Sequence, residues 1–174
     1  MTVSAGPWSP CSPFEAAGDL IWLPRLIDKG RRKLAGDAEG RDRLGDYMFG
    51  DHDYLDGFLL RFLAMGDSHV LAILRAEPDD HAAAMAIVRV SGKTPEQCRA
   101  WSASFRRWQW LALVNLDRDE GRLTLGPVGN WLALTVQNAV LPAFRFFYDR
   151  RERARPAARS GEPGCVAQAN GDTT

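Results

Sequence analysis

Apolar side chains recur at spacings of three and four residues along most of the chain, which is the periodicity of amphipathic helices. The spacing is clearest in three stretches, at residues 23–34, 55–63 and 101–112. Because each set shares one helical face, we expect the three faces to meet in one core. The side chains predicted to be buried in that core are Leu23, Leu26, Ile27, Phe58, Phe62, Trp101 and Phe105.

Capping residues and helix breakers divide this pattern into about seven helices. The order Ser12-Pro13-Phe14-Glu15 is that of a capping box, and it predicts a helix that begins at residue 12. Pro24 would kink a continuous helix, so we expect a break near Gly18 and a second helix from about Leu20 to Leu34. Gly36 is the expected end of that second helix.

The later boundaries rest on similar signals. Residues 37–50 form a polar linker in which we expect one short helical turn, at 44–49. Asp53 is expected to cap the next helix, and Thr94 and Gln97 have the spacing of a second capping box. The remaining helices are predicted to begin at Asp67 or Ser68, near Pro78 and at about Val128, with stops at Gly66, at Gly92, at 117–121 and at about Arg153.

No stretch of sustained alternation predicts a sheet. We therefore expect an all-α protein, an irregular multi-helix bundle with a disordered C-terminal tail. The expected organisation is a disordered lead-in over 1–11, a single helical domain over 12–153 and a disordered tail over 154–174.

Composition narrows the class of protein. The formal net charge of the 174 residues is zero, so no overall field favours nucleic acid, and we expect no nucleic-acid partner. Three widely spaced cysteines and the absence of a signal-peptide pattern predict a reducing, cytoplasmic location. Arginine far outnumbers lysine, which is typical of a GC-rich bacterial genome.

A resemblance to a known family rests on three stretches of the chain: Trp22-Leu23-Pro24-Arg25-Leu26-Ile27-Asp28-Lys29, then Gly45-Asp46-Tyr47, and then Asp51-His52-Asp53-Tyr54-Leu55-Asp56. With the Ser12-Pro13 opening, the chain resembles a bacterial family of small helical domains of unknown function, over about residues 12–101. The resemblance implies a fold and a set of shared residues, and it implies no activity.

Two charged clusters are the candidate site. The first is Arg25, Asp28, Lys29 and Arg32, which could line the mouth of a pocket, form an exposed face of helical pairs, or make a buried structural salt bridge. The second is the acidic segment from Asp46 to Asp56, whose carboxylates could hold a cation or simply cap a helix. We expect the two clusters to be in contact. The candidate binding residues are Arg25, Asp28, Lys29, Asp46, Tyr47 and Asp53.

Three functions remain open at this point. The first is a non-catalytic binding or protein-interaction module, whose partner is a protein or a small anionic ligand. The second is a small enzyme that uses the carboxylates, with or without a metal, although no catalytic residue can be named and we expect no cofactor and no resident metal. The third is peripheral membrane binding or a homodimer through the apolar helix predicted at 128–153, which polar residues interrupt too often for a transmembrane span.

Arginines interleave with aromatic residues at 99–110, a pattern that can bind nucleic-acid bases. Trp101, Phe105 and Trp108 nevertheless share one helical stripe, so we expect them to be core, with Trp110 off the stripe. His69 and His81 have no metal-ligand spacing, and we expect both on the surface.

Overall fold

A computed structural model describes residues 8–124, 126–129, 131 and 134–135. The chain divides into two compact units, residues 1–133 and 134–174, and the fold described here is that of the first unit. Its elements are the strands β1 (Ala16–Ala17) and β2 (Leu20–Ile21), the helices α1 (Leu23–Glu39), α2 (Tyr54–Leu63), α3 (Asp67–Ala76), α4 (Asp80–Ser91) and α5 (Pro95–Asp119), and the 3-10 helix η1 (Gly50–His52). The prediction of an all-α bundle is confirmed, with one small hairpin added.

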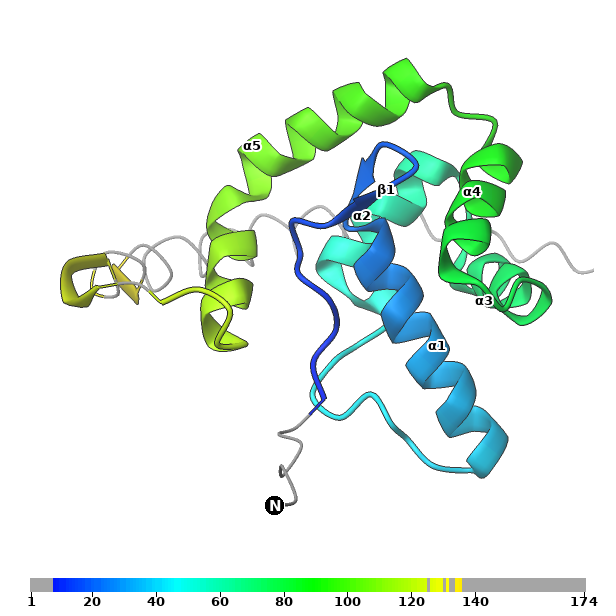
Figure 1. Cartoon of the computed structure of the whole chain (residues 1–174), viewed down its shortest axis with the longest axis horizontal. Coiled ribbons are helices and arrows are strands. Elements are labelled where there is room, and N and C mark those ends of the chain that lie inside the picture. The colour runs from blue at the N-terminus through cyan, green and yellow to red at the C-terminus, as the bar shows by residue number, and fades with distance from the viewer. Residues whose placement is uncertain (1–7, 125, 130, 132–133, 136–174) are drawn as a thin grey trace, which may run out of the picture. The chain divides into compact units, whose positions relative to one another are not determined.

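The helix α1 is central to the fold (Figure 1). It packs against α3 and α4, which also contact each other, while α5 contacts the hairpin at β2. The core predicted from helical spacing is confirmed for Leu23, Leu26, Ile27 and Phe105, which are buried. Phe58, Phe62 and Trp101 are half-buried and pack against that core.

The prediction of a helix that begins at residue 12 is wrong, because residues 16–21 form an antiparallel hairpin. Gly18 and Asp19 form its two-residue loop, and both have positive φ, of 55° and 63°. Loops of this kind match the twist of paired strands. The Ser12 N–H still donates to the Glu15 carboxylate, as in a capping box, but the Glu15 N–H donates to the Ser12 carbonyl oxygen and closes only a turn. Two-residue strands are too short to show any alternation in the sequence.

The second helix was expected from about Leu20, but it begins at Leu23 because Leu20 and Ile21 form β2. It extends beyond Gly36 to Glu39, where Gly40 caps it with φ 66°. Gly36 is buried inside the helix because the following loop returns over it. A Cβ at position 36 would lie 2.4 Å from the carbonyl oxygen of Arg41. Within the stretch 44–49, where a short helical turn was predicted, the chain makes one hydrogen-bonded turn, in which the Tyr47 N–H donates to the Leu44 carbonyl oxygen at 3.2 Å. The 3-10 helix follows it, at Gly50–His52.

The remaining helix boundaries largely match the predictions. Asp53 caps α2, Gly92 ends α4 and Thr94 and Gln97 form a complete capping box at α5. His69 and His81 are exposed as expected. Positions 127–129, 131, 134 and 135 are helical, while the rest of the helix predicted at 128–153 and the tail predicted at 154–174 lie outside the described residues.

Long polar side chains fix the elements to one another. Arg31 of α1 donates to Asp80 Oδ1 at 2.9 Å and to the carbonyl oxygens of Leu74 and Glu77, so it caps the end of α3. Ser102 of α5 accepts from the backbone N–H of Ile21 at 3.0 Å and joins α5 to the hairpin.

In the described part of the chain, no single helix is long and apolar enough to cross a membrane. Only α2 and α3 taken together meet that length and composition, and they are bent by 78°.

Candidate functional site

Lys29 is the centre of a buried ion-pair cluster between α1 and α2. Its side chain is 1% exposed, and its Nζ donates to Asp53 Oδ2 at 2.8 Å and to Asp56 Oδ1 at 2.7 Å. Asp56 is fully buried and also accepts from Trp22 Nε1 at 2.7 Å and from the backbone N–H of Gly50 at 3.1 Å. The cluster therefore joins the start of α1, the 3-10 helix η1 and the first turn of α2.

The two carboxylates share a single lysine, and this affects their protonation. Burial raises the pKa of Asp56 to about 6, because Lys29 only partly offsets the lost hydration and Asp53 adds a like charge. Perturbed carboxyl groups often mark reaction sites, but buried structural ion pairs perturb pKa values in the same way. Here every oxygen of Asp56 accepts a hydrogen bond from the protein itself.

Arg25 forms a second buried cluster one turn earlier on α1. Its Nη1 donates to the carbonyl oxygen of Cys11 at 2.7 Å and to Glu120 Oε2 at 3.0 Å, and its Nη2 donates to Glu120 Oε1. Tyr47 donates its hydroxyl to Glu120 Oε1 at 2.9 Å. Burial acts to raise the pKa of Glu120, but hydrogen bonds from Arg25 and Tyr47 hold it below its ordinary value.

Aromatic rings alternate with cations around these two clusters. The Arg25 guanidinium lies 5.3 Å from the ring centroid of Trp22 and 5.5 Å from that of Tyr47, and Lys29 Nζ lies 5.4 Å from Trp22. Trp8 in turn packs edge-on against Tyr47 at 5.6 Å. Such cation–π contacts are worth most where water is excluded, so the stack stabilises two buried cations that would otherwise be costly.

The predicted contact between the basic and acidic clusters is confirmed for Lys29 and Asp53, and Arg25 contacts Tyr47 through the ring. Arg25 and Lys29 do not line the mouth of a pocket, however, because both are buried. Of the three arrangements possible for the basic cluster of α1, the geometry of Arg25 and Lys29 matches the buried structural salt bridge.

The other predicted residues are spread around the two clusters. Asp28 is half-buried and accepts from the backbone N–H of Cys11 at 2.8 Å, which holds the N-terminal segment against α1. Asp46 is exposed, and Asp53 is half-buried because it also caps α2. We expected residues 8–11 to be disordered, but this expectation is wrong. They pack against the fold and are half-buried or buried.

Sequence reasoning missed two members of these clusters, Trp22 and Glu120. It did not count Asp56 among the candidate binding residues, although Asp56 ends the acidic segment that was expected to meet Lys29. Trp22 was noted only as part of the shared stretch. Nothing in the sequence indicated that Glu120 pairs with Arg25, because the two residues are 95 positions apart. Glu120 follows the end of α5, which the neighbouring polar residues and Gly121 already explained.

Other reactive groups offer little chemistry. Burial raises the pKa of the Cys11 thiol to about 12, with a contribution from Glu15, and burial also raises the pKa of Cys98. Thiols of high pKa are poor nucleophiles at neutral pH. Within the part of the chain that the structure describes, no group of three His, Cys, Asp or Glu side chains could hold a metal ion.

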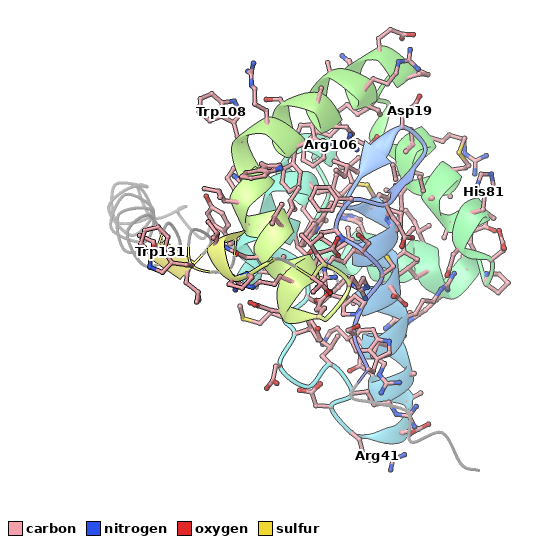
Figure 2. The ribbon with its side chains drawn as sticks, turned by 60° about the vertical axis from the view of Figure 1, so that its left-hand side comes forward. Asp19, Arg41, His81, Arg106, Trp108 and Trp131 are labelled. Carbon is pink, nitrogen blue, oxygen red and sulfur yellow. The ribbon has the colours of Figure 1, made fainter. Side chains whose placement is uncertain are left out.

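The outer side of α5 is the other notable surface. Trp108 is 71% exposed and Trp110 is 54% exposed, and Figure 2 shows Trp108 pointing away from the ribbon. Trp110 was expected off the core stripe, but the prediction that Trp108 is core is wrong. The buried line of α5 runs from Cys98 through Phe105 to Leu113, which leaves position 108 on its flank.

A family described as a domain of unknown function (DUF5069) matches residues 8–119, well over half of the chain. The chain belongs to this family. The match is wider than the 12–101 expected from the shared residues. It adds residues 8–11 and the rest of α5, from 102 to 119. No curated protein sequence matches the chain. The family thus covers most of both buried clusters without assigning them an activity.

Proposed function

We propose that the chain is a non-catalytic protein-interaction module, in which the buried clusters fix the helices and the outer side of α5 binds a partner. The observation that carries the proposal is the exposure of Trp108, at 71%, and Trp110, at 54%, on a helix whose other side buries Cys98, Phe105 and Leu113. Tryptophan and arginine are the residues most enriched in the energetic centres of protein interfaces, and Arg106 and Arg107 are exposed beside these rings.

The burial of the shared charged residues supports a binding module rather than an enzyme. A general acid or base must reach the substrate. Asp56 and Lys29 are covered by protein atoms, and the hydrogen-bonding capacity of Asp56 is used internally. An enzyme that used Asp56 would need the core to open at each turnover. Asp28 and Asp53 are half-buried, and they already accept hydrogen bonds from the Cys11 N–H, from Lys29 and from the first turn of α2.

Membrane contact or self-association through residues 128–153 is a second candidate. Val128 and Trp131 are 71% and 64% exposed, and exposed apolar side chains of this size often mark an interaction segment. Most of that segment lies outside the described residues, so this candidate rests on its sequence.

Photo-crosslinking in the producing cells tests the proposal. A benzophenone amino acid replaces Ser104, an exposed residue of α5, and for comparison Arg75, an exposed residue of α3. A specific partner should crosslink at position 104 and not at position 75. The dissociation constant of the purified partner should then rise at least about tenfold for Trp108→Ala/Trp110→Ala, with unchanged thermal unfolding.

The matched control is Met85→Ala, which removes an exposed apolar side chain from α4 and should leave the affinity unchanged. The proposal fails if the partner binds the double tryptophan variant with full affinity. It also fails if Asp46→Ala or Asp28→Ala abolishes binding without loss of stability, because the acidic segment would then be the site.

A further inference from the structure

The outward strip of α5 has the spacing of a helix-pairing seam. Its members lie four, three, four and three residues apart, which keeps them on one line along the helix, and they are Ala100, Ser104, Arg107, Leu111 and Val114. The first three are exposed and the last two are half-buried. Trp108 and Trp110 differ by about 200° around the helix axis, so one ring lies on each side of the strip.

The same strip is positively charged. Between Cys98 and Leu116, α5 carries three arginines and no acidic residue. Arg99 is neutralised by Asp19 at 2.9 Å and by Glu96 at 2.8 Å. Arg106 and Arg107 form no ion pair within the described residues, and the guanidinium of Arg107 lies 5.5 Å from the ring of Trp108. Among the described residues, two uncompensated cations therefore remain: Arg107 within the strip and Arg106 on the Trp110 side of it.

Resting on the proposed function, we infer that the partner contributes an amphipathic α-helix with acidic flanks, which lies along this strip between the two tryptophans. The apolar side of such a helix would cover the low strip of Ala100 and Ser104, and its carboxylates would pair with Arg106 and Arg107. Helix-in-groove recognition of this kind uses anchors at helical spacing.

Two other occupants fit the strip less well. A second copy of the chain would place the same arginines against each other across a two-fold axis. Single-stranded nucleic acid stacks successive bases on rings that share a face, whereas the rings of Trp108 and Trp110 diverge.

Three labelled helical peptides test the inference by fluorescence anisotropy with the full chain. Each has the same leucine seam at heptad spacing, and its flanking positions are all Glu, all Gln or all Lys. We expect the Glu peptide to bind at least about tenfold more tightly than the Lys peptide at low salt, with the difference shrinking as salt screens the charges. Arg106→Glu/Arg107→Glu should reverse that preference.

Arg75→Glu/Arg89→Glu reverses two exposed arginines on α3 and α4 and should leave the preference unchanged. Equal binding of the Glu and Lys peptides, binding too weak to measure for all three, or tighter binding of a twenty-nucleotide oligo-dT would overturn the inference. A crosslinked partner that needs Trp108 and Trp110 while the peptides show no charge preference would refute this inference and leave the proposed function standing.

Discussion

Lys29 is charged in the interior because two carboxylates and the indole of Trp22 replace its lost water. Moving an ion out of water costs several kcal/mol, and only close, well-oriented partners compensate for that cost. The contacts at 2.7 and 2.8 Å supply these partners. The same pairing makes each member dependent on the others, since removing one leaves an uncompensated buried charge.

Lys29→Met should therefore lower the free energy of unfolding by about 3–5 kcal/mol, because it leaves Asp56 buried without its cation. Chemical denaturation measures this loss. Lys33→Met is the matched control, because Lys33 is on the same helix with a side chain 37% exposed and a longer 4.0 Å contact to Asp37. That substitution should change stability by less than about 0.5 kcal/mol. Equal effects of the two substitutions would contradict this account of Lys29.

The pKa of Asp56 predicts a dependence of stability on pH. Below its ordinary pKa of 3.8 the carboxyl is protonated in both states, and between 3.8 and about 6 only the folded state keeps the proton. The free energy of unfolding should therefore fall as pH rises across this window, by about 1.4 kcal/mol per unit and about 3 kcal/mol in total.

Asp56→Asn removes this titration, so the difference between wild type and variant should decrease from pH 4 to pH 6. Glu120 acts in the opposite sense, because its lowered pKa contributes stability that is lost as pH falls, but it is common to both proteins and cancels. Asp46→Asn controls for the loss of one negative charge at an exposed position. A difference that stays constant with pH would count against the raised pKa.

Local sequence predicted half of this arrangement. Lys29 and Asp53 could be expected to meet because a polar linker connects their helices, and opposite charges at that density usually pair. The partnership of Arg25 with Glu120 could not be predicted. It depends on where the end of α5 lies relative to α1, which packing of the whole core determines.

At the scale of elements, helices with side-chain caps were predictable. Asp53, Asp79 and Thr94 each accept the hydrogen bond that begins a helix, and such bonds depend only on neighbouring residues. The hairpin at 16–21 was not predictable from pattern. It is held by its partner helix, since Ser102 of α5 donates to the carbonyl oxygen of Asp19 at 2.8 Å and accepts from Ile21.

The crossing of α1 and α3 depends on Gly30. A Cβ at this position would lie 2.4 Å from Leu74 Cδ1 and 3.2 Å from a ring carbon of Phe49. Gly30→Ala should therefore destabilise the fold by about 1–3 kcal/mol, although alanine is the better helix former. At Gly66 the nearest atom to a Cβ, His69 Nδ1, is 3.9 Å away, so Gly66→Ala should have little effect on the melting temperature. A more stable Gly30→Ala protein would show that the helices separate easily.

Across the whole unit, the two buried clusters connect segments that are distant in sequence. The N-terminal segment 8–12 contributes backbone carbonyls to Arg25 and Arg122 and a hydroxyl from Ser12 that donates to Asp117. The family match begins at Trp8, whose ring packs on Tyr47.

Removing residues 1–11 should therefore destabilise the protein, while removing only residues 1–7 should not. The longer deletion takes away the carbonyl acceptors of Arg25 and the ring that packs on Tyr47. Charge-assisted hydrogen bonds contribute about 1.5–3 kcal/mol each, so we expect a loss of about 2–4 kcal/mol by chemical denaturation. Two deletions of equal stability would mean that this segment is not part of the fold.

The central claim is that the shared charged residues hold the fold and do not bind the partner. It is tested most directly by measuring stability and partner affinity together in the neutral double variant Lys29→Met/Asp56→Asn. Removing both charges should cost at least about 2 kcal/mol less than the sum of the single variants, because no fully buried charge then lacks a partner. Asp53 also loses Lys29, but it is half-buried and still accepts N–H groups at the start of α2. The folded double variant should bind the partner crosslinked at position 104 with wild-type affinity. A stable double variant that no longer binds that partner would contradict the account, because Lys29 and Asp56 would then belong to the functional site.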